Sequence, residues 1–139
     1  MREILFRGKT EDGRWVEGCL VKGTFYYNDE EMTCIIPVDN TFYPRCEISS
    51  YEKVIPETVG QLTGCWDEDG IAIFEGDILL YRDQSNKVLF NEEPYIVKYS
   101  NTLAAFIAED ECENWDYIIP QEYKIIGNIH DNPELLKEA

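Results

Sequence analysis

The sequence lacks several features on which common protein functions depend. It has no apolar run approaching the roughly 18 residues that a membrane-spanning helix needs, and its first apolar stretch is too short for a signal peptide. It also lacks the glycine-rich loop patterns that hold nucleotide phosphates. We therefore expect a protein of the cytoplasm that has no membrane contact and no cofactor.

Histidine and clustered cysteine are equally scarce. His130 is the only histidine, which excludes a metal site built on two imidazoles. The five cysteines are at least twelve positions apart, whereas zinc sites use closely spaced pairs. We predict no metal site, and we interpret the thiols as small buried hydrophobic groups. They are Cys19, Cys34, Cys46, Cys65 and Cys112.

Basic residues are few, with 12 against 28 acidic ones, and the formal net charge is −16. Residues 1–56 carry ten acids and seven bases, a net charge of −3, whereas residues 57–139 carry eighteen acids and five bases, a net charge of −13. Such a field repels phosphate backbones, so we expect no direct binding of nucleic acid. The excess serves solubility, which we favour, or attraction to a basic protein surface.

What the sequence has in abundance is short strands. Aromatic residues make up 13% of the chain, nine of them tyrosines, which suits half-buried strands. Asp12-Gly13 between apolar segments predicts a type I′ hairpin. A second hairpin is predicted from Thr24–Tyr27 to Met32–Ile36, with Pro37 and Pro44 at strand ends or sheet edges. The whole pattern indicates a mainly β protein with a small barrel or sandwich.

Pro56 marks the expected boundary between an N-terminal β-hairpin lobe, residues 1–56, and a second β lobe, residues 57–139. Strands are expected in the second lobe at residues 59–64, 71–74, 78–81, 94–99, 103–107, 117–120 and 123–129. A short C-terminal helix is predicted from Pro133 to Glu138, with Asn132 as its cap.

Six segments together resemble the YopX family of phage and prophage proteins. They are FRGK (residues 6–9), GRWVEG (13–18), TVGQLTG (58–64), DEDG (67–70), IFEGDIL (73–79) and IIGNIHDNPELL (125–136). The resemblance implies a mainly β protein whose later portion is an SH3-like barrel. It also implies a bacterial host cell as the setting and a homo-oligomer. It supplies no catalytic residues, because no biochemical activity is established for the family.

The most suggestive functional element is an acidic segment that contains a tryptophan. No basic residue lies between Lys98 and Lys124, and a tryptophan amid charge is typical of contact hot spots. The alternative, which we favour, is a solvated loop whose tryptophan packs onto the barrel. The predicted partner-binding residues are Glu109, Asp110, Glu111, Glu113, Trp115 and Asp116.

Other patterns are better explained by structure than by chemistry. An EF-hand register that puts Gly70 at the required glycine places Cys65 and Gly76 at the first and last ligand positions, so Asp67–Gly70 is interpreted as a hairpin turn. Glycines that interrupt apolar runs are expected to be structural, because a side chain there would strain or block the backbone. The predicted structural residues are Gly60, Gly64, Gly76, Asp77, Gly127 and Pro133.

The leading hypothesis is therefore a phage accessory protein without enzymatic activity, a β scaffold that self-associates or binds a host protein. Self-association is expected through the less acidic first lobe, at Thr24–Tyr27. One alternative is an acidic DNA mimic or anti-repressor that occupies a basic nucleic-acid-binding surface. The other is a small hydrolase that uses His130 with Cys112 or Ser100.

Overall fold

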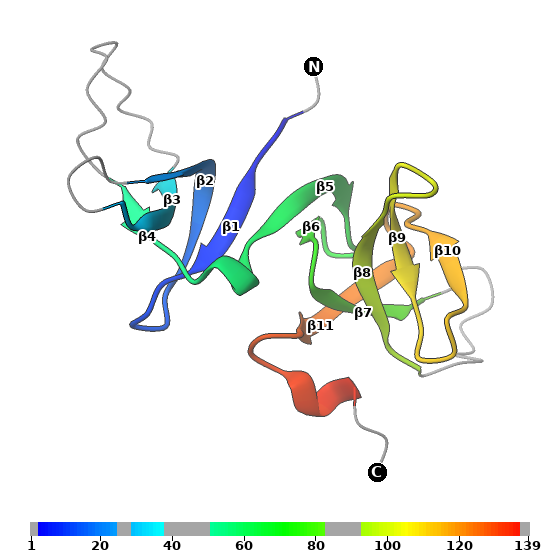
Figure 1. Cartoon of the computed structure of the whole chain (residues 1–139). Helices are drawn as coiled ribbons and strands as arrows, with labels where there is room; N and C mark the ends of the chain where they lie inside the picture. Colours follow the sequence, from blue (N-terminus) through cyan, green and yellow to red (C-terminus); the bar gives the residue numbers. More distant parts are fainter. Residues whose placement is uncertain (1–2, 25–28, 38–50, 83–92, 137–139) are drawn as a thin grey trace. The chain divides into compact units, whose positions relative to one another are not determined.

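The computed structural model describes residues 3–24, 29–37, 51–82 and 93–136, and these form a mainly β protein (Figure 1). Two antiparallel sheets have the strand orders β4-β3-β2-β1-β5-β6 and β10-β9-β8-β7-β11. The chain divides into two compact units, Met1–Gln61 and Leu62–Ala139. The predicted boundary residue, Pro56, begins a short 3₁₀ helix. The division instead falls within β5.

In the first unit, β1 to β4 form a meander in which each strand pairs with its neighbour in sequence, and the start of β5 pairs with β1. Strand β2 is the longest and pairs with β1 on one side, as the first predicted hairpin requires, and with β3 on the other. The second hairpin differs from its prediction, because β3 pairs with residues 18–24 of β2, and of the predicted strand Thr24–Tyr27 only Thr24 lies in this described ladder. The elements are β1 (Phe6–Lys9), β2 (Trp15–Thr24), β3 (Glu31–Pro37), β4 (Glu52–Lys53) and η1 (Pro56–Thr58), followed by the start of β5 (Gly60–Trp66). Pro37 ends β3 as predicted, whereas Phe25–Tyr27 and Pro44 lie outside the described residues.

Two glycines let the strands of this unit approach closely. A Cβ atom on Gly18 would lie 1.8 Å from the carbonyl oxygen of Ile36 on β3. A Cβ atom on Gly8 would lie 2.9 Å from the Val54 side chain and 3.1 Å from Ile35. Ile35 and Val54 are buried, so the missing side chain of Gly8 provides room for the core of this unit. Neither glycine stood out in the sequence as structural.

The second unit contains the strands β6 (Ala72–Phe74), β7 (Asp77–Tyr81), β8 (Tyr95–Ser100), β9 (Ala105–Glu109), β10 (Trp115–Tyr117) and β11 (Tyr123–Asn128), besides the end of β5. In the five-stranded sheet of the described residues, β10 and β11 are the two edges and do not pair with each other. The sheet is therefore not a closed barrel, and the SH3-like barrel stays a prediction.

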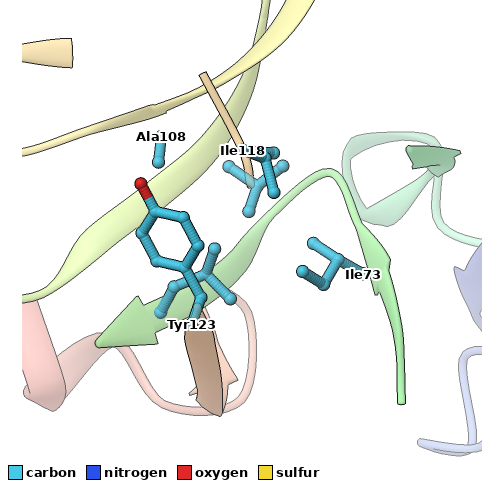
Figure 2. Packing of buried hydrophobic residues seen from close by; sticks show 6 residues of the cluster. Ile73, Ala108, Ile118 and Tyr123 are labelled. Carbon is cyan, nitrogen blue, oxygen red and sulfur yellow. The ribbon is translucent and has the colours of Figure 1, made fainter. Parts of the chain in front are cut away.

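The core of the second unit lies between this sheet and the β5–β6 hairpin. Ile73 of β6 and Tyr123 of β11 are buried together with Leu79, Val97, Ala108 and Ile118. Figure 2 shows Ile73, Ala108, Ile118 and Tyr123 with their side chains directed toward a common centre. The Tyr123 ring makes edge contacts with the rings of Tyr81 and Tyr95, at centroid distances of 5.5 and 6.2 Å. Residues far apart in the sequence thus share one apolar interior.

Three hairpin loops in the two units have the same hydrogen-bond pattern. The loops span Thr10–Arg14, Asp67–Ile71 and Asp110–Asn114, and in each the first residue's amide donates to the last residue's carbonyl. The fourth residue donates its amide to the first residue's carbonyl and has a positive φ. This is a type I turn followed by a left-handed residue. The type I′ turn predicted at Asp12-Gly13 is wrong, because only Gly13 has a positive φ.

The remaining elements agree with the sequence in kind more than in bounds. The predicted strand at 117–120 instead starts at Trp115 and ends at Tyr117, because the tight loop from Asp110 to Asn114 brings the chain back early. The C-terminal helix is one 3₁₀ turn, η2 (Pro133–Leu136), in the described part of the chain. Asn132 does not act there as a side-chain cap, because its Oδ1 accepts the amide of Asn128 at 3.2 Å.

The two glycines of β2 provide a matched test of this packing. Gly18→Ala should destabilise the protein by roughly 1–3 kcal/mol, because the added methyl group meets a backbone oxygen that cannot move alone. Gly23→Ala should be neutral or slightly stabilising, because nothing lies within 4 Å of a Cβ atom there. Denaturant unfolding of both variants measures the difference, and equal stability would contradict the close approach of β2 and β3.

Candidate functional site: the β9–β10 hairpin

The predicted acidic loop is a tight β-hairpin in the structure. Glu109 is the last residue of β9, and Trp115 and Asp116 belong to β10, so the loop itself is only the segment between them. Strand β10 pairs with β9 in the register Trp115↔Glu109, Asp116↔Ala108 and Tyr117↔Ile107. All three residues of β10 are exposed. The described chain therefore displays this strand on the surface at the edge of the sheet.

Two of the predicted partner-binding carboxylates have structural contacts. Asp110 Oδ1 accepts the amides of Cys112 and Asn114, both at 2.9 Å, and its Oδ2 accepts Nδ2 of Asn114 at 3.2 Å. Glu109 forms a salt bridge of 2.9 Å with Lys98 across the β8–β9 pair. Asp110 thereby shapes the hairpin, because an aspartate at the first turn position stabilises the loop, whereas Glu109 is held by Lys98 of the neighbouring strand β8.

The other acidic side chains of the hairpin are turned to solvent. Glu111 and Glu113 are exposed in the loop. Asp116 is exposed on β10, where its Oδ1 accepts the amide of Tyr117 at 2.8 Å. The structure thus separates the six residues predicted from sequence into Asp110, which builds the loop, Glu109, which pairs with β8, and four, including Trp115, that it presents outward.

Trp115 and Tyr117 form an exposed aromatic pair. They are 45% and 52% exposed, and their ring centroids lie 5.4 Å apart with an angle of 84° between the ring planes. Both lie on the same face of the strand, because side chains alternate along β10. The expectation that Trp115 packs down onto the barrel is not met, since nearly half of the residue remains accessible.

Glu113 holds a backbone conformation that side chains disfavour. Its φ is +64°, whereas Gly13 and Gly70 occupy the same position in the other two loops with φ of +90° and +82°. A left-handed residue with a side chain costs on the order of 1 kcal/mol relative to glycine. The hairpin at the candidate site is therefore the one of these three loops that keeps a charged side chain at the strained position.

The predicted structural residues around Gly76 form a compact junction. Gly76 has a φ of +89°, donates its amide to the carbonyl of Val97 and accepts the amide of Ile129. Asp77 is 2% exposed, and its Oδ2 accepts the amide of Phe74 at 2.8 Å. The turn before β7 is thereby tied to β8 and to the segment after β11.

The other predicted structural residues are placed as follows. Gly64 has a φ of +86°, and Gly60 is buried where β5 pairs with β1. A Cβ atom on Gly127 would lie 2.5 Å from Oδ1 of Asn132. Pro133 is the first residue of η2. A positive φ or a close neighbour thus gives a physical reason for glycine at three of the four predicted positions, which are Gly64, Gly76 and Gly127.

His130 lies beside Gly76, with its Nε2 3.6 Å from the place of a Cβ atom on that glycine. Its backbone amide donates to Oδ1 of Asn128 at 3.0 Å. The nucleophiles considered with it lie in hairpins: Cys112 is in the β9–β10 loop, and Ser100 Oγ accepts the amide of Leu103 at the end of β8. Neither the amide contact of His130 nor the hydroxyl contact of Ser100 involves the imidazole ring. The hydrolase stays an untested hypothesis.

The four cysteines in the described residues divide into two kinds, and Cys46 lies outside those residues. Cys34 is fully buried and Cys65 is partly buried, and burial raises the pKa of both thiols. Cys19 and Cys112 are exposed, so the prediction of buried thiols is wrong for these two. Within the described ranges there is no cluster of three or more residues suited to a metal ion. The same ranges contain no helix with the length and apolar character that crossing a bilayer requires.

Sequence reasoning missed the role of Asp67. The turn interpretation of Asp67–Gly70 is confirmed, but the carboxylate of Asp67 is also fully buried. Its Oδ1 accepts the amides of Asp69 and Ile71, both at 2.9 Å, and its Oδ2 accepts the amide of Ile125 on β11 at 3.2 Å. An aspartate at the first position of a hairpin loop was a visible signal for the local bonds only.

The family model described as YopX protein matches residues 5–137 of the chain. The chain belongs to the YopX family. Among solved structures, it is similar to protein EF1440 from Enterococcus faecalis, with 28% sequence identity and a TM-score of 0.63 over 99% of this chain and 100% of that one. No curated protein matches.

The part of the chain that matches the YopX model includes Gly8 and Gly18 of the first unit, and it also includes the buried aspartates of the second unit. The segments that carried the resemblance in the sequence have identifiable physical roles here. Gly8 and Gly18 permit close packing, Gly76 adopts a positive φ, and Asp67 and Asp77 accept backbone amides. The YopX signature of this chain therefore describes its framework, and the β9–β10 loop lies outside the segments that carried it.

Glu113→Gly should raise the free energy of unfolding by roughly 0.5–1 kcal/mol, because glycine adopts a positive φ without steric cost. Glu111→Gly is the control, because Glu111 lies in the same loop without a positive φ and gains nothing from glycine. Both are measured by urea unfolding. A loss of stability in Glu113→Gly equal to that in the control would show that the strain is absent.

Proposed function

We propose that the protein is a phage or prophage accessory protein without enzymatic activity, which binds a basic protein partner in the cytoplasm of the bacterial host. The contact surface would be the β10 surface, defined as Glu111, Glu113, Trp115, Asp116 and Tyr117. The observation that carries this proposal is the exposed Trp115–Tyr117 pair on an edge strand. Its members contact each other and leave about half of their area accessible.

The energetics favour a contact role for this pair. Tryptophan and tyrosine are enriched at the energetic centres of protein interfaces, where each buries a large apolar area. An edge-to-face contact limits the motion of both rings before binding, which lowers the entropy cost of ordering them at an interface. The β10 surface would therefore offer a partly preorganised apolar centre.

The surrounding charge indicates the chemistry of the partner. Residues 62–139 carry seventeen acidic and five basic residues. Glu111, Glu113 and Asp116 border the aromatic pair and are exposed. A basic surface would be attracted to this border, which raises the rate of association at low salt. Nucleic acid and anionic membrane would be repelled by the same field.

The scaffold that presents this surface is, we propose, an open variant of an SH3-like barrel. The support comes from the contacts on the free side of β11. The Gln121 amide donates to the carbonyl of Trp66, and the Glu68 amide donates to the carbonyl of Tyr123. Lys124 approaches the carboxylates of Glu68 and Asp69 at 3.8 and 3.5 Å. The end of β5 thus contacts the edge opposite to β10 without a continuous strand ladder.

Affinity capture from infected bacterial cells tests the proposal with a matched pair of tryptophans. Trp115 and Trp66 are 45% and 44% exposed, respectively, and belong to the same unit. Trp115→Ser should abolish recovery of a basic partner, whereas Trp66→Ser should retain it, and recovery should fall as salt rises. Identical recovery with both variants would contradict the assignment of the surface.

The same experiment addresses the alternatives. Displacement of the captured partner by duplex DNA would identify the DNA mimic or anti-repressor, since the two ligands would then share one basic surface. Recovery of this chain alone would support self-association. Its proposed location is Thr24–Tyr27 of the first unit, most of which lies outside the described residues.

A further inference from the structure

The backbone of β10 has a defined polarity at the sheet edge. In an antiparallel pair, opposite residues alternate between hydrogen-bonded and non-hydrogen-bonded pairs. The Asp110 amide donates to the carbonyl of Asn114, so that pair is hydrogen-bonded. The register then makes Trp115↔Glu109 and Tyr117↔Ile107 non-hydrogen-bonded pairs. The N–H and C=O groups of Trp115 and Tyr117 therefore point away from β9, toward the open edge.

The outward groups of the two residues differ in their contacts. The Tyr117 amide donates to the Asp116 carboxylate at 2.8 Å, and its carbonyl accepts the Tyr123 hydroxyl at 3.5 Å. For the outward N–H and C=O groups of Trp115, no hydrogen bond is found in the described part of the chain. Trp115 is thus open at both outward backbone groups, whereas the amide of Tyr117 is covered by the exposed Asp116 carboxylate and its carbonyl by the Tyr123 hydroxyl.

We propose that β10 binds its partner by strand addition. An extended, basic segment of the partner lies antiparallel or parallel to β10 and makes backbone hydrogen bonds with Trp115 and Tyr117. Its apolar side chains pack on the Trp115–Tyr117 rings, on one face of the extended sheet. Its lysines or arginines, on alternate positions, reach the opposite face, where Asp116 lies. This inference rests on the proposed function and names its binding mode.

Charge complementarity selects this occupant over a second copy of the chain. Pairing of two β10 strands would bring Asp116, Glu111 and Glu113 of both copies together, and like charges across a strand pair are destabilising. A basic strand instead supplies a carbonyl and an amide to Trp115 and a counter-charge to Asp116. When its carbonyl replaces the Asp116 carboxylate at the Tyr117 amide, that carboxylate becomes available to a basic side chain.

The probe for this mode is an eight-residue peptide of alternating lysine and valine, labelled with a fluorophore and added to the full chain. Two matched probes have the same sequence and charge, but each carries N-methyl groups on the amides of one edge and so lacks the donors of that edge. The unmodified peptide should bind at low salt, and the peptide methylated on the edge that faces away from β10 should bind equally tightly. The peptide methylated on the edge that faces β10 should bind at least about fivefold more weakly, because each lost backbone hydrogen bond reduces affinity.

A pair of protein variants tests the edge from the other side. Trp115→Ala removes the ring and keeps the outward N–H group, whereas Trp115→Pro removes both. Proline is tolerated at an edge position whose N–H faces outward. The proline variant should bind the peptide several-fold more weakly than the alanine variant. The peptide comparison on the unmodified protein does not depend on either variant folding.

Equal affinity of all three peptides would overturn strand addition and show attraction by charge alone. Absence of binding by the unmodified peptide at low salt would overturn it as well. Either result leaves the capture experiment with Trp115→Ser and Trp66→Ser to decide the proposed function separately. Failure of that capture experiment with success of the peptide experiment would place the natural partner elsewhere while confirming the binding mode of the edge.

Discussion

The second unit depends on a buried carboxylate, that of Asp67. Burying an ionised carboxylate is costly unless hydrogen-bond donors replace water, and here three backbone amides do so. Two of these amides close the loop between β5 and β6, and the third belongs to Ile125 on β11. The two oxygens of this carboxylate thereby join a local turn to a distant strand. Because the β5–β6 hairpin carries Ile73 into the core beside Tyr123, the position of that hairpin determines how the interior is covered (Figure 2).

The opposite edge of the sheet is built from the same kind of loop but has a different consequence. Asp110 occupies the position of Asp67 and accepts two amides in the same way, yet its third contact is the side chain of Asn114 within the loop. The β9–β10 hairpin is therefore completed locally and is not tied down by a distant strand through this carboxylate. Its strand leaves Trp115 and Tyr117 exposed, and its loop retains Glu113 at a positive φ. The same type of loop thus fixes the β5–β6 hairpin over the core, and in the β9–β10 hairpin it leaves the aromatic pair exposed.

Local sequence signals predict much of this fold. The features that they miss have one cause in common, which is a contact with a residue distant in the sequence. Alternating apolar residues and turn residues predict most strands and the first hairpin of the first unit, and Pro133 predicts the terminal turn. The burial of Asp67 could not be predicted in this way, because Ile125 is 58 positions away in the sequence. Gly18 escaped notice because its reason is a carbonyl oxygen on a neighbouring strand. At the candidate site, the acidic residues and Trp115 were visible in the sequence. Their division into loop-building and outward-facing groups depended on where Asp110 closed the turn.

The structural role of the Asp67 carboxylate is tested most directly by comparing Asp67→Asn with Asp110→Asn in urea unfolding. Asparagine has the same shape but directs an NH₂ group at one or more of the three amides that Asp67 accepts, and a buried donor left without an acceptor costs roughly 1–3 kcal/mol. Asp67→Asn should therefore lower the free energy of unfolding by about that amount. Asp110→Asn should change it by less than about 0.5 kcal/mol, because water can reach that loop. Equal effects of the two substitutions, or none from Asp67→Asn, would contradict the account.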